Sequence, residues 1–184
     1  MLSLLTPQDL PQIYRLLEES FPREEYRSYS GHQALLDNAA YRVYGLPDGA
    51  ELNALLALWD FEDLAYIEHL AVSPALRSAG LGSTVLEEAL QNLGKRVCLE
   101  VEPPETDLAR RRIGFYQRHG FTLNPYPYWQ PPFSPEQQGL PLLVMSTGGA
   151  LSPEEFHQVR STLYRRVYGL DRQGEAIYIR KAEK

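Results

Sequence analysis

Residues 64–93 constrain the fold more than any other part of the chain. The run Leu64–Val72 is almost entirely apolar and β-favouring, which predicts a buried strand. A short loop that contains Pro74 and Gly80 follows it. Apolar residues then recur at helical spacing over Leu81–Leu93, and Gly94 supplies a stop. A buried strand that leads through a tight loop into an amphipathic helix predicts a sheet covered by helices.

Sequence signals for helices and strands also occur before residue 64 and after residue 93. Thr6 and Pro7 are typical of a helix start, and Ser152, Pro153 and Glu155 form a capping box before another helix. We expect strands at 41–44, 52–61, 64–72, 97–101, 121–123, 140–145 and 176–179, and helices over 7–21, within 23–39, over 81–93, around 109–119 and from 153 onward. Strands and helices therefore mix in one domain of the α/β (α+β) class, with a mixed sheet.

Composition narrows the class of protein further. Of 184 residues, 43% are hydrophobic and 23% charged, which is typical of a globular domain. Acidic residues outnumber basic ones by 24 to 18, the opposite of a nucleic-acid-binding protein. The single cysteine, Cys98, excludes an internal disulfide framework. We expect no nucleic-acid partner, no membrane span, no metal site and a cytoplasmic location, since no apolar run, signal peptide or metal-ligand spacing is visible.

The loop between the strand and the helix carries the clearest chemistry. Gly80 and Gly82 allow a tight turn and a close approach of the backbone to a ligand. The first N–H groups of a helix have no partner within the helix, and the helix dipole adds positive charge there. With Arg77 at its edge, the segment fits a pyrophosphate. The alternative is a tight turn that only packs the helix against the strand.

Two motifs in this region resemble those of a known family. Residues 69–74, His-Leu-Ala-Val-Ser-Pro, and 77–82, Arg-Ser-Ala-Gly-Leu-Gly, resemble the coenzyme A signature of the GNAT superfamily of N-acyltransferases. Downstream, residues 115–121 resemble the family's Tyr-x-x-x-Gly-Phe motif. The resemblance extends over roughly residues 3–124 in element order.

This resemblance implies a fold and a cofactor site. The fold would be one GNAT-like domain over 1–150, with a mixed, mostly antiparallel sheet that is split near its centre and flanked by helices. Residues 151–184 would add a helix and tail packed on the same domain. By resemblance, acetyl-CoA would contact Leu70, Ala71, Val72, Arg77, Ser78, Ala79, Gly80, Leu81, Gly82 and Ser83. Many relatives also use an Asn at the place where this chain has Ala109, so no such contact is expected.

The implied reaction transfers an acetyl group from acetyl-CoA to a primary amine by direct attack. An alkyl amine has a pKa near ~10.4, so a base must remove a proton before it can attack. Glu68, Glu100 and, two residues further along the same strand face, Glu102 are the candidate bases, with Glu68 slightly favoured over Glu100. His69 is a further alternative, expected to face away from Glu68. By resemblance, Tyr116 would protonate the leaving sulfur.

The sequence leaves several alternatives open. A coenzyme A binding module without catalysis, acting as a sensor or partner protein, would share the loop. An acyltransferase with a longer acyl donor would share both motifs. The amine acceptor could be a small molecule or a peptide, and the protein a monomer or a homodimer. The Pro- and aromatic-rich stretch 125–139 either forms a wall of the acceptor pocket or merely covers the sheet.

Overall fold

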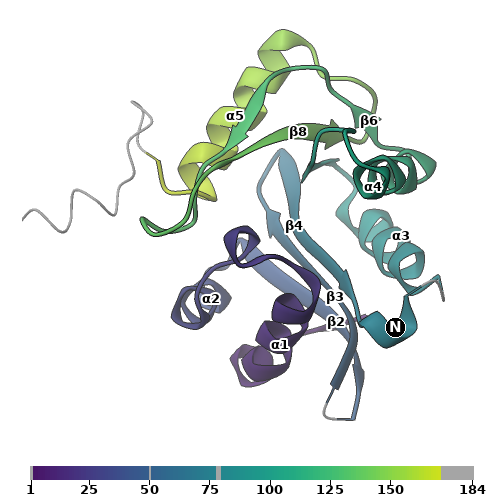
Figure 1. The fold of residues 1–184 in the computed structure, drawn as a ribbon, viewed down its shortest axis with the longest axis vertical. Coiled ribbons are helices and arrows are strands. Elements are labelled where there is room, and N and C mark those ends of the chain that lie inside the picture. The colour runs from purple at the N-terminus through teal and green to yellow at the C-terminus, as the bar shows by residue number, and fades with distance from the viewer. Residues whose placement is uncertain (1, 50, 78–79, 171–184) are drawn as a thin grey trace, which may run out of the picture.

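A mixed sheet forms the centre of the computed structural model, which describes residues 2–49, 51–77 and 80–170 (Figure 1). The strands are β1 (Ser3–Leu4), β2 (Tyr41–Asp48), β3 (Glu51–Asp60), β4 (Leu64–Val72), β5 (Arg96–Val101), β6 (Thr122–Leu123), β7 (Tyr128–Gln130) and β8 (Leu140–Ser146). The helices are α1 (Leu10–Ser20), α2 (Tyr29–Leu36), α3 (Leu81–Leu93), α4 (Asp107–Arg118) and α5 (Pro153–Arg166), with 3₁₀ turns at Pro7–Asp9, Arg23–Glu25 and Pro74–Leu76.

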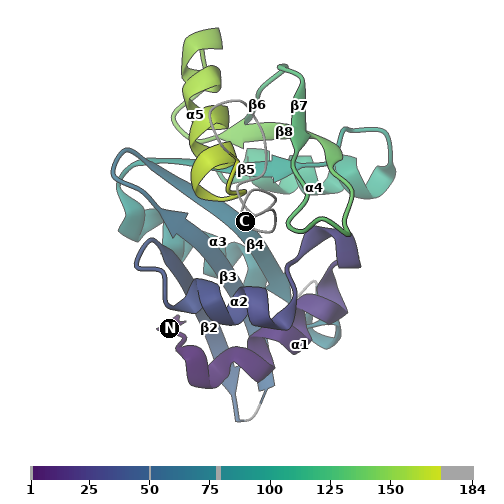
Figure 2. The same cartoon turned by 90° about the vertical axis from the view of Figure 1, so that its left-hand side faces the viewer.

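The sheet opens at its centre. Its strand order is β1-β2-β3-β4-β5-β8-β6, and β7 pairs with β8. Strands β4 and β5 are parallel and the other pairs are antiparallel, so the predicted mixed, mostly antiparallel sheet is confirmed. The parallel pairing ends at Ile67 and Leu99. Beyond it, β4 runs on to Val72 and β5 to Val101 without pairing with each other, so the two strands diverge (Figure 2).

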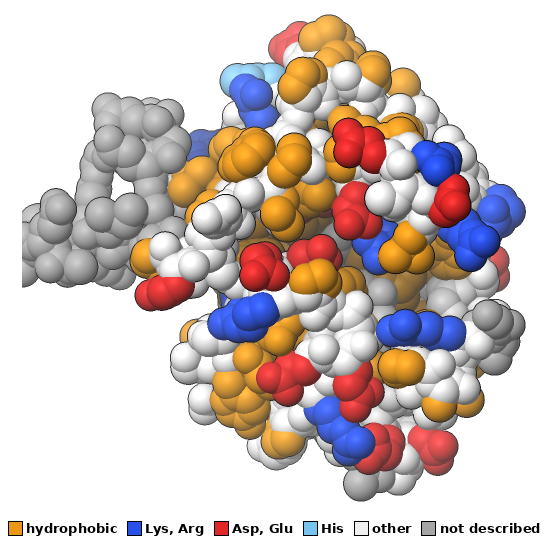
Figure 3. All heavy atoms as spheres, viewed as in Figure 1, with side chains coloured by type: hydrophobic (Ala, Val, Ile, Leu, Met, Phe, Trp, Pro, Cys, Tyr) orange, Lys and Arg blue, Asp and Glu red, His pale blue; other side chains and the backbone are white. Residues whose placement is uncertain are grey.

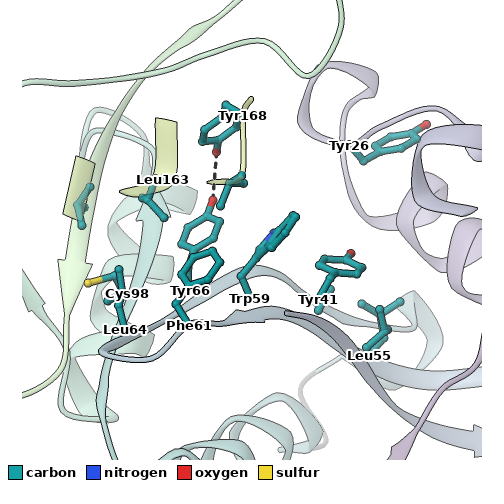
Figure 4. Packing of buried hydrophobic residues seen from close by; sticks show 14 of the residues in the cluster. Tyr26, Tyr41, Leu55, Trp59, Phe61, Leu64, Tyr66, Cys98, Leu163 and Tyr168 are labelled. Carbon is teal, nitrogen blue, oxygen red and sulfur yellow. Dashed lines mark hydrogen bonds between the residues drawn. The ribbon is translucent and has the colours of Figure 1, made fainter. Parts of the chain in front are cut away.

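Helices cover both faces of the sheet. One core joins α1 and α5 to one face, through residues such as Ile13, Leu17, Tyr66 and Leu163. The other core joins α3 and α4 to the opposite face, through residues such as Leu86 and Ile113. Figure 2 shows α1 and α2 in front of strands β2–β4, and Figure 4 shows the aromatic centre of the first core around Tyr66, Trp59 and Tyr41.

Strand β4 contains a bulge that changes which way its side chains point. Ala57 pairs with His69 and Leu58 pairs with Ile67, so Glu68 is an extra residue. The burial pattern shifts accordingly: Tyr66 and Ala71 both pack into the α1/α5 core, although they are five positions apart. His69 and Glu68 consequently lie on the same face, with His69 Nδ1 3.8 Å from Glu68 Oε2. The prediction that they face opposite sides is wrong, because regular alternation fails at a bulge.

Most local signals specify the elements as expected. Gly94 ends α3 in the left-handed conformation, with φ of 59°, and Ser152 caps α5 by accepting a hydrogen bond from the Glu155 N–H. Two strands differ from the prediction. Strand β2 extends through Asp48, because pairing with β3 continues into the residues expected to form the turn. Strand β7 was not predicted. The predicted strand 176–179 lies outside the described residues. Across the described ranges, no helix combines the length and apolarity that a membrane crossing requires.

Candidate active site

A cleft of about 360 Å³ lies where β4 and β5 diverge. Its walls come from both faces of the sheet. The α3/α4 side contributes mainly apolar groups and one tyrosine, namely Ile67, Leu70, Val72, Leu99, Val101 and Tyr116. The α1/α5 side contributes mainly polar groups, among them Tyr66, Glu68, His69, Glu100 and Gln130. The cleft therefore has one apolar side and one polar, acidic side, which meet at the gap between the strands.

The predicted phosphate loop leads from the cleft to the start of α3. Gly80 is the residue before the helix, has φ of 80° and provides no side-chain cap. No described residue accepts a hydrogen bond from the N–H groups of Leu81, Gly82 or Ser83. The helix start thus presents amides that no described residue pairs and the positive end of its dipole, as an anion site requires. Ser78 and Ala79, also predicted to contact the cofactor, lie outside the described residues.

Arg77 and the free edge of β4 connect this loop to the cleft. Arg77 lines the cleft, and its Nε donates to the Val72 carbonyl at 3.4 Å. Leu70, Ala71 and Val72 also line it. On the side facing β5, residues 68–72 of β4 have no strand beside them within the described part of the chain. Their backbone groups on that side are therefore available to a ligand.

Tyr116 lies at the cleft from its position near the end of α4. Its ring packs edge-on against Phe121, with 5.6 Å between the ring centres, and Ala109 and Ile113 are buried on the same helix. No hydrogen bond among the described residues uses the Tyr116 hydroxyl. Burial raises the pKa of Tyr116 to about 12, against the opposing effect of the Arg112 charge. At neutral pH the group is a protonated donor.

The Glu100 carboxylate accepts several hydrogen bonds, and their donors were not among the candidate site residues predicted from the sequence. These hydrogen bonds come from the Tyr128 hydroxyl, from Gln130 Nε2 at 2.8 Å and from the Tyr168 hydroxyl at 2.7 Å. The Tyr168 hydroxyl also lies 3.2 Å from that of Tyr66, as drawn in Figure 4. Burial raises the pKa of Glu100, and the donated hydrogen bonds offset only part of this effect. The aromatic stretch 125–139, which supplies two of the donors, was the only sequence signal for them.

Glu68, in contrast, is held in a buried ion pair. Its Oε1 accepts a hydrogen bond from Arg27 Nη1 at 2.5 Å and a longer one from Trp59 Nε1 at 3.4 Å. Arg27 also donates to the Val167 carbonyl at 3.0 Å and lies over the Phe133 ring, so several segments meet at this pair. Burial acts to raise the pKa of Glu68, but the Arg27 charge and hydrogen bond bring it below the ordinary value.

Further carboxylates extend the acidic side toward the rim. Glu25 and Glu102 line the cleft, and Glu102 pairs with Arg112 at 3.1 Å. Burial raises the pKa of Glu25, while Arg112 opposes the shift. Figure 3 shows acidic side chains, with basic ones between them, around the hollow between the upper and lower parts of the molecule. This distribution favours a cationic ligand on the α1/α5 side of the cleft.

A sequence model of the acetyltransferase (GNAT) family matches residues 10–121. A GNAT-family protein from Bacteroides thetaiotaomicron is 36% identical, with a TM-score of 0.83 over 93% of this chain and 99% of that one. The chain therefore belongs to the GNAT family of acetyltransferases, as the two motifs indicated.

Two more distant structures share the fold. A ribosomal-protein alanine N-acetyltransferase from Escherichia coli is 21% identical, with a TM-score of 0.61 over 84% of this chain and 96% of that one. The PaiA N-acetyltransferase from Thermoplasma acidophilum, solved in complex with coenzyme A, is 16% identical, with a TM-score of 0.57 over 80% and 98%. No curated protein sequence matches the chain.

Proposed function

We propose that this protein is an N-acetyltransferase that moves an acetyl group from acetyl-CoA to an amine. The observation that carries the proposal is the two-sided cleft. Helix-start amides that no described residue pairs and an apolar wall lie toward α3 and α4, acidic groups lie on the opposite side, and Tyr116 lines the apolar side. A thioester donor and a cationic acceptor can enter such a cleft from opposite faces of the sheet and meet in the gap between the strands.

The side of the cleft that would bind the acetyl donor has the features of an anion-binding site. The N–H groups of Leu81, Gly82 and Ser83 and the α3 dipole suit the diphosphate, and Arg77 adds a cation nearby. The free edge of β4 at residues 70–72 suits the amide-bearing arm of the cofactor, which can pair with it as a strand does. The relative solved with coenzyme A supports the choice of cofactor.

The acceptor side must first remove a proton from the amine. We assign this step to Glu100 rather than to Glu68. A base works best when its pKa lies near the working pH, and burial raises the pKa of Glu100. The pKa of Glu68 is instead lowered by Arg27, which makes its carboxylate a poorer proton acceptor. The ion pair, which the sequence does not reveal, thus reverses the slight preference for Glu68.

The remaining steps form the C–N bond, break the C–S bond and move protons between the amine, Tyr116 and Glu100. The amine lone pair forms the C–N bond, and the carbonyl electrons move onto oxygen, where a backbone N–H of residues 70–72 can stabilise them. Collapse of this intermediate breaks the C–S bond, and the Tyr116 hydroxyl gives its proton to the sulfur. Of the two protons that leave the ammonium nitrogen, one replaces the proton of Tyr116 and one passes from Glu100 to solvent.

Two measurements test the proposal. Titration calorimetry with coenzyme A and acetyl-CoA should detect binding, and a screen of amines should detect acetyl-CoA-dependent thiol release. Donors of increasing acyl length, run with one active amine, should show the highest kcat/KM for acetyl. Binding without thiol release for any amine would instead favour a catalytically silent coenzyme A module, and absence of binding would contradict the cofactor assignment.

A further inference from the structure

An open groove on the outer side of α4 carries more positive charge than its own residues neutralise. It has a volume of about 610 Å³ and is lined by Asp107, Arg110, Arg111, Gly114 and Arg118. Three arginines and one aspartate leave two positive charges there, although the whole chain has a net charge of −6. Figure 3 shows basic side chains, with acidic ones between them, over α4 at the upper right. Concentrated positive charge on an acidic protein indicates a place for an anion.

The three arginines of this groove differ in their partners. Arg110 donates to Asp107 Oδ1 at 2.6 Å and to the Pro104 carbonyl at 2.8 Å, so its charge is already engaged. Arg111 and Arg118, both exposed, form no ion pair or hydrogen bond with a residue that the structure describes. Their two guanidinium groups are therefore available to a ligand.

Gly114 keeps the space between these two arginines open. Residues three and four apart on a helix are neighbours on its surface, so Arg111, Gly114 and Arg118 lie in one line along α4. A Cβ atom at Gly114 would lie 3.5 Å from Arg118 Nη1, so the Arg118 side chain lies back over the glycine. Glycine destabilises a helix interior relative to alanine. The helix thus has a hollow between two cations at a position where almost any other residue would favour the helix more.

This side of α4 adjoins the start of α3. A Cβ atom at Gly82 would lie 3.8 Å from Phe115 Cζ, so Phe115 contacts the first turn of α3. One turn further along, His119 Nε2 lies 3.4 Å from Glu87 Oε1, so α4 runs beside α3. The two free arginines stand four positions before and three positions after Phe115, and so flank it on the helix surface. They therefore border the helix start whose amides we assign to the diphosphate.

We propose that Arg111 and Arg118 bind the 3′-phosphate of coenzyme A, and that this protein therefore discriminates against donors that lack this phosphate. The inference rests on the proposed function. In coenzyme A the diphosphate and the 3′-phosphate are attached to the same ribose, so a diphosphate on the α3 amides brings the 3′-phosphate to the neighbouring helix surface. A phosphate monoester carries a charge of about −1.5 to −2 at pH 7, which two guanidinium groups neutralise. Arginine can also bind phosphate oxygens through two parallel N–H donors.

This contact acts on binding of the donor and leaves the chemical step alone. The 3′-phosphate lies at the opposite end of the cofactor from the thioester, so its contacts are the same in the ground state and in the transition state. Loss of the contact should therefore raise KM for acetyl-CoA and leave kcat nearly unchanged. Because both arginines are exposed, the contact should also weaken as salt screens their charge.

The test compares coenzyme A with 3′-dephospho-coenzyme A by titration calorimetry. For the wild-type protein we expect about ten-fold tighter binding of coenzyme A at low salt, and a smaller ratio at high salt. The double variant Arg111→Gln/Arg118→Gln should bind both compounds equally and keep the wild-type affinity for 3′-dephospho-coenzyme A. Gly114→Glu, which places a carboxylate between the arginines, should also remove the preference. Equal affinities in the wild type, or a preference that persists in the double variant, would overturn the inference.

The matched control is the double variant Arg160→Gln/Arg165→Gln. It removes the same charge from α5, which packs on the opposite face of the sheet, and neither residue lines the cleft or the α4 groove. Arg165 donates to the Ser161 carbonyl of its own helix, so its loss should not disturb the fold. This variant should keep the preference for coenzyme A, and its loss here would mean that net charge alone causes the preference and would overturn the inference.

The binding measurements separate this inference from the proposed function, since they need no amine and no turnover. If coenzyme A binds more tightly than its dephospho form but no amine is acetylated, the phosphate site stands and the proposed reaction does not. If acetyl transfer occurs with the same KM for acetyl-CoA and for acetyl-dephospho-CoA, the reaction stands and the phosphate site is wrong. If neither compound binds, both are wrong.

Discussion

The Tyr168 hydroxyl donates a 2.7 Å hydrogen bond to Oε2 of Glu100, and so joins the segment after α5 to the end of β5. Gln130 Nε2 lies 3.0 Å from the same hydroxyl, which ties β7 into this contact. The proposed base therefore depends on residues that follow it by 30 and 68 positions. Helix α5 contributes to the candidate active site by placing Tyr168, in addition to covering the sheet.

Tyr168→Phe should move the pH dependence of catalysis. The lost hydrogen bond stabilises the charged form of Glu100, so its removal should raise the pKa of Glu100 further. The rise of kcat/KM with pH at its acidic end should then occur at higher pH than in the wild-type protein. A pH–rate profile of kcat/KM measures this. Tyr164→Phe, which loses only a 2.6 Å hydrogen bond to the Trp129 carbonyl, should leave the profile in place.

Glu100→Gln should separate activity from stability. We expect kcat/KM to fall by about 10²–10⁴-fold, the range for loss of a general base. Because burial raises the folded pKa of Glu100, its contribution to stability is full below the unfolded pKa and is lost as pH rises through the folded pKa. The variant should therefore be at least as stable as the wild type at pH 8. A clear loss of stability there, measured by urea unfolding, would contradict this assignment.

Glu68→Gln should have the opposite effect on stability. It leaves the Arg27 charge buried without its partner, which costs about 3–5 kcal/mol in comparable pairs. The folded pKa of Glu68 is lowered, so its contribution is present above the unfolded pKa and is lost as pH falls through the folded pKa. Urea unfolding should show a large difference from wild type at pH 7 that shrinks in acid. Combining it with Arg27→Met should restore part of the stability, because no unpaired charge remains.

Two glycines at opposite ends of α3 allow a controlled test of the phosphate loop. Gly80 and Gly94 both have positive φ, 80° and 59°, so alanine at either position should destabilise the protein by about 1–2 kcal/mol. Of the two, only Gly80 precedes the α3 amides that the described residues leave without an acceptor. Gly80→Ala should weaken coenzyme A binding in calorimetry, whereas Gly94→Ala should leave the affinity unchanged. Equal affinities in the two variants would place the diphosphate elsewhere.

Tyr116→Phe should reduce kcat and leave acetyl-CoA affinity nearly intact. The hydroxyl is proposed to act only on the developing thiolate, and loss of such an acid costs about 10²–10⁴-fold. The pKa of Tyr116, about 12, keeps it protonated through the usable pH range. Its ionisation should therefore not lower the wild-type rate below pH 10. Pre-steady-state measurement of thiol release isolates this step, and an unchanged rate in the variant would remove Tyr116 from the mechanism.

Local chemistry made much of the fold predictable. The bounds of β4 and α3 follow from an apolar run, a glycine-containing loop and a helical stripe within one segment. The capping residues at Thr6 and Ser152 act over three positions, so they are visible in sequence. The two family motifs located the cleft for the same reason: each lies within one strand–helix unit whose geometry is set by its own residues.

The chemical state of the candidate acids and bases was not predictable in this way. Arg27 meets Glu68 across 41 positions, and no local pattern marks the pair. The bulge that places His69 beside Glu68 arises from pairing with β3, which no residue of β4 encodes alone. These contacts decide which carboxylate is a poor proton acceptor, and they exist only once distant strands have come together.

The sequence by itself determined the strand–loop–helix unit and, through the two motifs, the family, because short-range spacing fixes these features. Glu68, Glu100 and Tyr116 reach one cleft only through the pairing of β4 with β5 and the packing of α4. The tertiary structure decided how the two glutamates differ. Glu68 is buried against a cation, Glu100 is buried among hydroxyl and amide donors, and the free energy of each ionised carboxylate depends on those neighbours.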